Sequence, residues 1–256
     1  MTSSAPAGGD RPGGPALGDV GPPGRPRPEA AGLGLGAVGA ALGALGGAQE
    51  RWPPDLGAVR TLHADDLTAA DGQGGLAAGA AQADALADAG VRLLVVDGAS
   101  EERPDVLVLL AALLSLEPVA AVGTDPEPGW AGTVVAVRDG LPAARRHGSD
   151  VPALLDAVAA PRTAVLTGLL ARSALRRTPV LLDGRADVVA AALLADRLCP
   201  GAAGWWLAGA TPARPAARRA LDELGLPALL DLGLRRPGGA SLAFTVLRAT
   251  LELAGG

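Results

Sequence analysis

Three aspartate-glycine pairs in the chain follow segments with the character of β-strands. They are Asp97-Gly98, Asp139-Gly140 and Asp183-Gly184. A carboxylate can act as a base, and glycine lets the backbone approach an anion closely. In open α/β sheets, ligands bind outside the carboxyl ends of the strands, where these pairs are expected to fall. The alternative is that each pair only forms a tight turn, which Asp and Gly favour for backbone reasons.

The other residues with chemical potential are few and scattered. His63 and His147 are far in sequence from any cysteine or third histidine, so we expect turn or surface positions and no metal site. The single Cys199 cannot form an internal disulfide, which favours a reducing cytoplasm and a small buried residue near a helix end. Trp205-Trp206 is expected to fill a core poor in aromatic residues, the alternative being a stacking platform for a base or corrin.

The charged residues give no sign of a polyanionic partner. The formal net charge is -5, so we expect neither nucleic acid nor an anionic membrane to be a partner. Three arginines, Arg214, Arg218 and Arg219, could contact a phosphate. Their spacing also suits one exposed face of a helix, and we favour the exposed face.

Strand-like and helix-like stretches alternate along the chain after residue 52. They predict an α/β fold with a parallel sheet and crossover helices on both faces, a Rossmann-like, doubly wound arrangement. The strand-like stretches are 91–96, 133–137 and 179–182, with 119–122 as a further short one. The helix-like stretches are 75–89, 106–116, 151–159, 163–176 and 188–198.

The first 30 residues differ in composition from the rest of the chain. They are dense in Pro, Gly, Ser and Ala, which predicts a disordered tail before a single α/β domain at 31–256. The uncharged run at 30–48 contains seven glycines, which weaken both helicity and transfer into lipid, so no membrane span is expected. Its G-x-G-x-x-G spacing follows a Pro-rich segment instead of a strand, which argues against a dinucleotide site.

The most specific pattern in the chain is LGLPALLDLGLR at 224–235. Before it come RTLHADDL at 60–67, GAAQADALADAGVRLL at 79–94 and PVLLDG at 179–184. In order and spacing these segments resemble the nicotinate-nucleotide:dimethylbenzimidazole phosphoribosyltransferase family, which makes the lower-ligand nucleotide of cobalamin. The resemblance covers most of the chain from about residue 35 onward, although a block that the family carries between its first strand and the next helix is absent.

The resemblance implies a reaction and a set of site residues. The family transfers phosphoribosyl from nicotinate mononucleotide to 5,6-dimethylbenzimidazole, and we expect a homodimer without cofactor or metal. The retained residues imply a substrate-binding role for Asp183, Gly184, Asp231, Arg235 and Gly239. Asp231 and Arg235 could brace one another or line a pocket. Alternatively, Asp231 caps a turn and Arg235 is a solvated cation.

The residues that carry the family's chemistry are replaced. The loop G-E-M-G-I-G-N is DGASEER at 97–103, A-D-H-G-V is ADDLT at 64–68, and G-G-F-E is AAPR at 159–162. G-E-G-T-G is PGGAS at 237–241, so the family's base position is Gly238. The chain also lacks Lys, Ile and Asn, as a GC-rich coding sequence would, but such a bias does not force out Glu, His or Gly.

These replacements leave two functions open. The transfer needs a carboxylate within about 3 Å of the benzimidazole nitrogen, together with backbone N–H groups that cradle a phosphate. Gly238 lacks the carboxylate, and the charges of Glu101 and Glu102 would repel a phosphate from the cradle loop. Either Glu101 or Glu102 takes over the base, or the chain is a catalytically inactive paralogue that serves as a partner subunit or ligand-binding protein.

Overall fold

The computed structural model of the chain describes residues 58–67, 72–148 and 150–254. The tail predicted at 1–30 and the glycine-rich run at 30–48 lie outside the described residues. Among the residues described, none of the helices combines the length and the apolar character that crossing a membrane requires.

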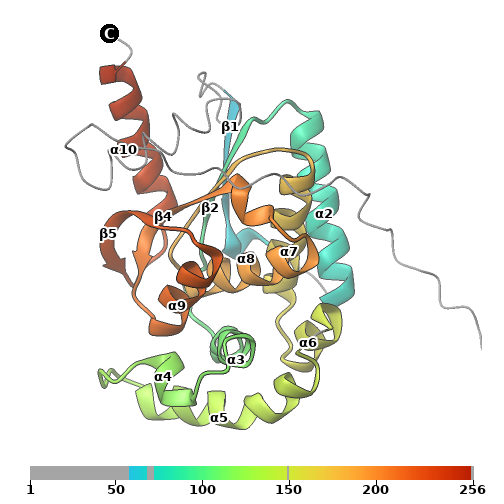
Figure 1. Cartoon of the computed structure of the whole chain (residues 1–256), viewed down its shortest axis with the longest axis vertical. Coiled ribbons are helices and arrows are strands. Elements are labelled where there is room, and N and C mark those ends of the chain that lie inside the picture. Colours follow the sequence, from blue (N-terminus) through green and yellow to red (C-terminus); the bar gives the residue numbers. More distant parts are fainter. Residues whose placement is uncertain (1–57, 68–71, 149, 255–256) are drawn as a thin grey trace, which may run out of the picture.

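A five-stranded sheet forms the centre of the molecule (Figure 1). Its strands are β1 Val59–His63, β2 Leu93–Asp97, β3 Val180–Leu182, β4 Trp206–Pro212 and β5 Ala228–Leu234. Every neighbouring pair is parallel. β2 and β3 are buried along their whole length, which explains why each appears in the sequence as an unbroken apolar run. The predicted α/β class and parallel sheet are therefore confirmed.

The winding of the sheet differs from the doubly wound arrangement predicted. The strands lie in chain order, β1-β2-β3-β4-β5, whereas a doubly wound sheet reverses its order at one point. Four helices pack against one face of the sheet as a single layer: α2 Gly72–Asp88, α7 Pro161–Leu175, α8 Ala186–Leu198 and α9 Pro215–Leu224. α10 Gly239–Ala254 covers the other face. Since every crossover advances one strand in the same direction, all four return over the same face.

A group of four further helices is inserted between β2 and α7. It comprises α3 Pro104–Leu113, α4 Pro118–Val122, α5 Trp130–Arg146 and α6 Val151–Ala157. Two short 3-10 helices, η2 Ala64–Asp66 and η3 Ala202–Trp205, complete the described elements. The helices predicted at 75–89, 106–116, 151–159, 163–176 and 188–198 correspond to α2, α3, α6, α7 and α8, and the strands predicted at 91–96 and 179–182 correspond to β2 and β3.

The strands predicted at 133–137 and 119–122 are wrong, because both stretches are helical. The first lies inside α5, whose inward face carries Trp130, Val134, Val137 and Leu141 at intervals of three and four residues. That periodicity is visible only over a window longer than five residues. The second stretch is α4, which Pro118 begins at its first turn. The Asp139-Gly140 pair is therefore helical and lies at no strand end.

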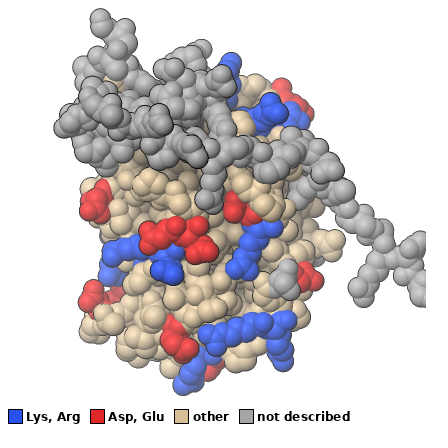
Figure 2. Space-filling model, viewed as in Figure 1, with Lys and Arg blue, Asp and Glu red and all other residues tan. Residues whose placement is uncertain are grey.

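Several single-residue expectations can be placed in this fold. Trp205 and Trp206 are both buried in the main hydrophobic core, as predicted, and neither ring reaches the surface to form a stacking platform. Cys199 is buried at the end of α8, and this burial raises the pKa of its thiol. His147 caps the end of α5 on the surface. On the face drawn in Figure 2, acidic and basic side chains are interspersed, so this face offers no extended basic surface.

Glycines allow α2 and α7 to cross closely. A Cβ atom at Gly79 would lie 1.9 Å from the carbonyl oxygen of Val165, and one at Gly168 would lie 2.0 Å from the carbonyl oxygen of Leu76. Both neighbours are backbone atoms, which cannot rotate away. The distance between the two helices is therefore fixed by the absence of a side chain at these two positions.

Replacing Gly79 by Ala should force the two helices apart. We expect Gly79→Ala to lower the free energy of unfolding by at least about 1 kcal/mol, the usual result of overpacking, in urea titrations followed by circular dichroism. The matched control is Gly132→Ala in α5, where a Cβ would meet nothing within 4 Å. That variant should be neutral or more stable by up to about 1 kcal/mol, because Ala favours a helix over Gly. Equal effects of the two substitutions would contradict the close crossing.

Candidate functional site

Buried carboxylates lie at the carboxyl edge of the sheet. Asp97 ends β2, and Asp183 follows β3 directly. One oxygen of Asp183, Oδ2, accepts the backbone N–H of Gly98 at 3.1 Å and that of Gly238 at 3.0 Å. Asp97 accepts the backbone N–H of Ser241 at 3.2 Å and also its hydroxyl. The two carboxylates thus tie the segment after β2 to the start of α10.

The segment after β2, residues 98–103, is here called the β2 loop. Its first three amides are each bound by a different carboxylate: Gly98 by Asp183, Ala99 by Asp187 at 2.8 Å, and Ser100 by Asp65 at 2.9 Å. The resemblance assigns the phosphate cradle to this loop. An N–H group has one hydrogen to donate, so an anion can use these amides only where a carboxylate gives way.

Burial and hydrogen bonding shift the pKa values of these carboxyl groups in opposite directions. Desolvation raises the pKa of Asp183 to about 6, against the opposing effect of the two amides that it accepts, while the neighbouring Asp97 and Asp187 raise it further. Burial also raises the pKa of Asp187, although the Ala99 amide offsets part of the rise. The hydrogen bond from the Ser100 hydroxyl lowers the pKa of the exposed Asp65. Asp183 therefore changes its protonation within the physiological range.

Glycines around Asp183 leave room for the converging loops. A Cβ at Gly239 would lie 2.5 Å from Oδ1 of Asp183, and one at Gly184 would lie 2.4 Å from the carbonyl oxygen of Ala210. Gly98 is similarly close to the side chain of Arg185. Close packing therefore explains the glycines of the Asp97-Gly98 and Asp183-Gly184 pairs without reference to a ligand.

Gly238, at the family's base position, has a different reason to be glycine. Its φ is +111°, a conformation that L side chains rarely adopt, yet a Cβ there would meet no atom of the described residues within 4 Å. The position has space for a side chain but a backbone that disfavours one.

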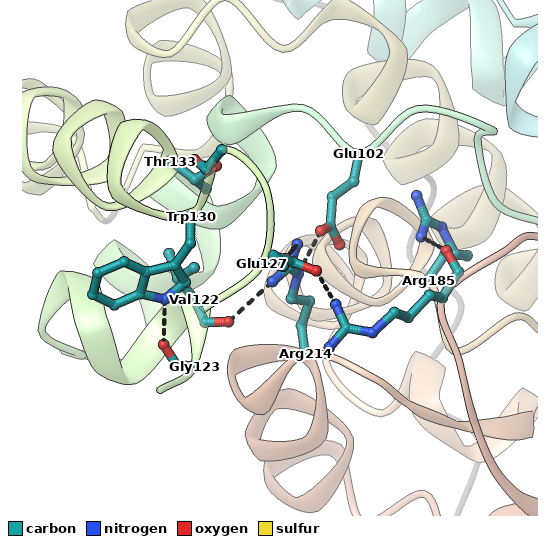
Figure 3. Close-up of polar contacts among 10 residues, drawn as sticks. Glu102, Val122, Gly123, Glu127, Trp130, Thr133, Arg185 and Arg214 are labelled. Atoms are coloured by element: carbon teal, nitrogen blue, oxygen red, sulfur yellow. Dashed lines mark hydrogen bonds and ion pairs between the residues drawn. The ribbon is translucent and has the colours of Figure 1, made fainter. Parts of the chain in front are cut away.

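A charged pocket of about 180 Å3 lies beside the carboxylates, at the ends of β3 to β5. We call it the arginine pocket and define it by Arg185, Arg214, Arg235, Glu102 and Glu127. Arg214 pairs with Glu102 and with Glu127, each at 2.5 Å, and Glu127 also pairs with Arg235. Figure 3 shows these contacts joining the β2 loop, the segment before α5 and the start of α9.

A second pocket, of about 230 Å3, lies on the other side of the β2 loop. Its lining includes Leu67, Ala99, Glu101, Val106, Arg162 and Asp187. Both pockets are smaller than the roughly 300 Å3 at which small-molecule sites usually begin. The β2 loop separates the two, so a ligand larger than one pocket would have to lie across this loop.

The predicted site residues are brought together only in part. Asp183, Gly184 and Gly239 meet at the carboxyl edge, and Arg235 lines the arginine pocket. Asp231 is exposed on β5, where it accepts the Thr211 hydroxyl at 2.9 Å. Asp231 and Arg235 thus have separate partners and do not brace one another.

The charged residues near the site also differ from expectation. Arg214 was expected on an exposed helix face, but it precedes α9, is 17% exposed at its side chain and pairs with two carboxylates. Arg218 and Arg219 are exposed as predicted. Glu102 was expected to repel a phosphate, but its ion pair with Arg214 offsets the charge of its carboxylate. Glu101 lines the second pocket, and His63 lies 3.9 Å from Asp97 at the end of β1.

Three members of this site were not predicted from the sequence. Asp187 lies in the first turn of α8, four residues after Asp183, a spacing that could have pointed to a second carboxylate at the same edge. Arg185 lies between them and is only 7% exposed. Glu127 comes from a polar segment before α5 and carried no signal in the sequence.

Comparisons with known proteins give a consistent result. The family model described as phosphoribosyltransferase matches residues 50–256. The nicotinate-nucleotide–dimethylbenzimidazole phosphoribosyltransferase of Mycobacterium avium (strain 104) is 41% identical over 241 residues, 84% of this chain and 69% of that protein. The enzyme of the same name from Mycobacterium tuberculosis (strain H37Rv) is 42% identical over 193 residues, 73% of this chain and 53% of that protein.

A solved structure extends the likeness to three dimensions. The crystal structure of nicotinate-nucleotide–dimethylbenzimidazole phosphoribosyltransferase from Thermus thermophilus is 31% identical, with a TM-score of 0.63. The match covers 70% of this chain and 54% of that one. The chain therefore spans only about half the length of that solved relative.

Proposed function

Because the chain belongs to the nicotinate-nucleotide:dimethylbenzimidazole phosphoribosyltransferase family, we propose that it acts in assembly of the lower-ligand nucleotide of cobalamin. The proposed reaction moves phosphoribosyl from nicotinate mononucleotide to 5,6-dimethylbenzimidazole. The observation that carries the proposal is 41% identity to a transferase of that name through 84% of the chain. The proposed location is the cytoplasm, where the lone Cys199 stays reduced, and the proposed assembly is a homodimer.

The reaction makes one carbon–nitrogen bond and breaks another. A ring nitrogen of the benzimidazole attacks the ribose C1′ atom, nicotinate leaves with the electron pair of its own bond to C1′, and the benzimidazole loses one proton. Gly238 offers no acceptor for that proton. Asp97 and Asp183 are buried and already hydrogen-bonded. Of the two glutamates in the β2 loop, Glu102 is held by Arg214, whereas Glu101 lines the second pocket, so we assign the proton to Glu101.

The two pockets suit the two halves of this chemistry. The guanidinium groups of the arginine pocket match a phosphate, and the second pocket adds the apolar walls of Leu67, Ala99 and Val106. In the proposal the phosphate of nicotinate mononucleotide enters the first and the benzimidazole ring the second. Glu101 is exposed and unrestrained by the fold, so it is a poorly positioned base and the transfer is slow.

A second candidate function is that of a catalytically inactive family member, which binds a ligand or pairs with an intact enzyme. Specific contacts favour it: the carboxylates of Asp65, Asp183 and Asp187 take the three amides of the β2 loop, and the base position is Gly238. Loss of both the base and the free amides would leave a scaffold without transfer activity.

Turnover separates the two functions. Purified protein incubated with nicotinate mononucleotide and dimethylbenzimidazole should form ribazole phosphate, detected by mass spectrometry, above a reaction without protein. Glu101→Gln should lower the rate at least about tenfold if Glu101 accepts the proton. Glu117→Gln is the control, because the carboxylate of Glu117 lies just before α4, is 81% exposed and lines neither pocket. Absence of product after long incubation with concentrated protein would exclude the transferase function.

A further inference from the structure

A short loop delivers Glu127 to the arginine pocket. Residues 123–129, here called the Glu127 loop, connect α4 to α5. Gly123 and Gly129 at its two ends have φ of +106° and +82°. The indole Nε1 of Trp130 donates to the carbonyl oxygen of Gly123 at 2.8 Å, and the backbone N–H of Trp130 donates to that of Glu127 at 2.9 Å. The loop is thus closed at its base and ends in glycines that can change conformation.

The carboxylate of Glu127 binds two arginines that come from distant parts of the chain. Its Oε1 atom lies 2.5 Å from Nη2 of Arg214, and its Oε2 atom pairs with Nη1 of Arg235 (Figure 3). Arg214 is further held by Glu102 and by the carbonyl oxygen of Val122. Glu127 therefore bridges two guanidinium groups as a bound anion would.

The pocket has more positive than negative charge. Three guanidinium groups, those of Arg185, Arg214 and Arg235, face two carboxylates, those of Glu102 and Glu127. Arg185 is 7% exposed, its Nη1 donates to the Arg235 carbonyl, and its buried Nε has no hydrogen-bond partner among the described residues. The first residue of α8, Ala186, also lines the pocket, and a helix N-terminus favours anions. Without Glu127, three guanidinium groups would face one carboxylate, which matches the charge of a phosphate monoester.

We propose that Glu127 is an internal stand-in for an anionic ligand and holds the arginine pocket closed until a phosphate monoester displaces it. In the closed state Glu127 occupies Arg214 and Arg235. In the open state the Glu127 loop turns outward on its glycines, and the phosphate takes both guanidinium groups together with Arg185. Only the identification of the ester as nicotinate mononucleotide rests on the proposed function.

Calorimetric titration tests the displacement directly. The probes are inorganic phosphate and nicotinate mononucleotide, and the proteins are the wild type, Glu127→Gln and Glu117→Gln. Glu117 is the matched control, because its carboxylate precedes α4, is 81% exposed and lies 4.0 Å from Arg145, away from the pocket. A closed state populated about nine times in ten lowers the apparent affinity about tenfold, so Glu127→Gln should bind both probes about tenfold more tightly than wild type. Glu117→Gln should bind them as the wild type does.

Two outcomes would overturn the device. One is equal affinity of wild type and Glu127→Gln, and the other is no binding of phosphate to either. Both measurements are independent of turnover. Tighter binding by Glu127→Gln in a protein without transfer activity would support the displacement of Glu127 and contradict the proposed transferase function. Equal affinity in a protein that forms product would support the transferase function and contradict the displacement.

Trp130 reports whether the loop moves. Phosphate added to the wild type should change the tryptophan emission, because displacement of Glu127 alters the loop that the Trp130 indole closes. The change should disappear in Trp130→Phe, which keeps the other three tryptophans of the chain, Trp52, Trp205 and Trp206. Trp205 and Trp206 lie buried in the core. Phosphate binding without any change of emission would show that Glu127 stays in place.

Discussion

Gly238→Glu is expected to raise the rate of phosphoribosyl transfer at least about 100-fold, the lower end of what a positioned base contributes. The substitution puts a carboxylate at the position where the family pattern has one. A Cβ at this position meets nothing within 4 Å, so the side chain has space. The backbone N–H of Gly238 donates to Asp183, and a glutamate at this position would keep the same backbone donor.

The backbone conformation of Gly238 opposes the same substitution. A φ of +111° is strained for any residue with a side chain, and such strain lowers the free energy of unfolding by roughly 1–3 kcal/mol. Gly238→Ala is the matched control, because it introduces the same strain without a carboxylate. We expect both variants to have a lower Tm than the wild type, and only Gly238→Glu to gain in kcat/KM. Equal rates for the two variants would show that the missing base does not limit the transfer.

The two strands that the sequence predicted correctly, β2 and β3, are buried along their whole length. The apolar runs ending at Asp97 and before Asp183 needed no tertiary information, because a parallel strand covered on both faces is apolar throughout. β4 was not assigned as a strand, since four of its seven residues are Ala, Gly or Pro, which are depleted in strands. Its conformation depends on pairing with β3 and β5, which a local pattern does not contain.

The site residues divide along the same line. The resemblance pointed to Asp183, Gly184 and Gly239, which the structure brings together, and close packing explains why two of them are glycines. Their role in substrate binding stays a prediction. The arginine pocket could not be predicted, since Glu127 pairs with Arg235 and Glu102 with Arg214 across more than a hundred residues. Arg214 was placed on an exposed face because its spacing from Arg218 is helical, but Arg214 lies just before α9 begins. Because Arg214 lies one residue before α9, its guanidinium group faces the arginine pocket and not the solvent.

Asp183 should make the stability of the protein depend on pH in an unusual direction. Its pKa is about 6 in the folded chain against an ordinary value of 3.8, so the folded state holds the proton more tightly than the unfolded state does. The contribution of Asp183 to stability is therefore greatest below pH 3.8 and is lost as the pH rises towards 6. The shift corresponds to about 3 kcal/mol in total, of which roughly 2 kcal/mol falls between pH 4.5 and pH 7.

Asp183→Asn isolates this contribution, because the amide oxygen can still accept the Gly98 and Gly238 N–H groups while the side chain stays neutral. We expect the free energy of unfolding of the variant minus that of the wild type to be about 2 kcal/mol larger at pH 7 than at pH 4.5, because only the wild type loses stability over this range. Asp187 is present in both proteins, but its charge acts on Asp183, so the loss of that interaction forms part of the measured difference. Urea titrations at several pH values measure the difference, with Asp222→Asn on the exposed face of α9 as the control that should show no such trend. A constant difference between wild type and Asp183→Asn across this range would mean that the buried carboxylate is stabilised as an anion by its two amides, and that those amides, not burial, set its charge.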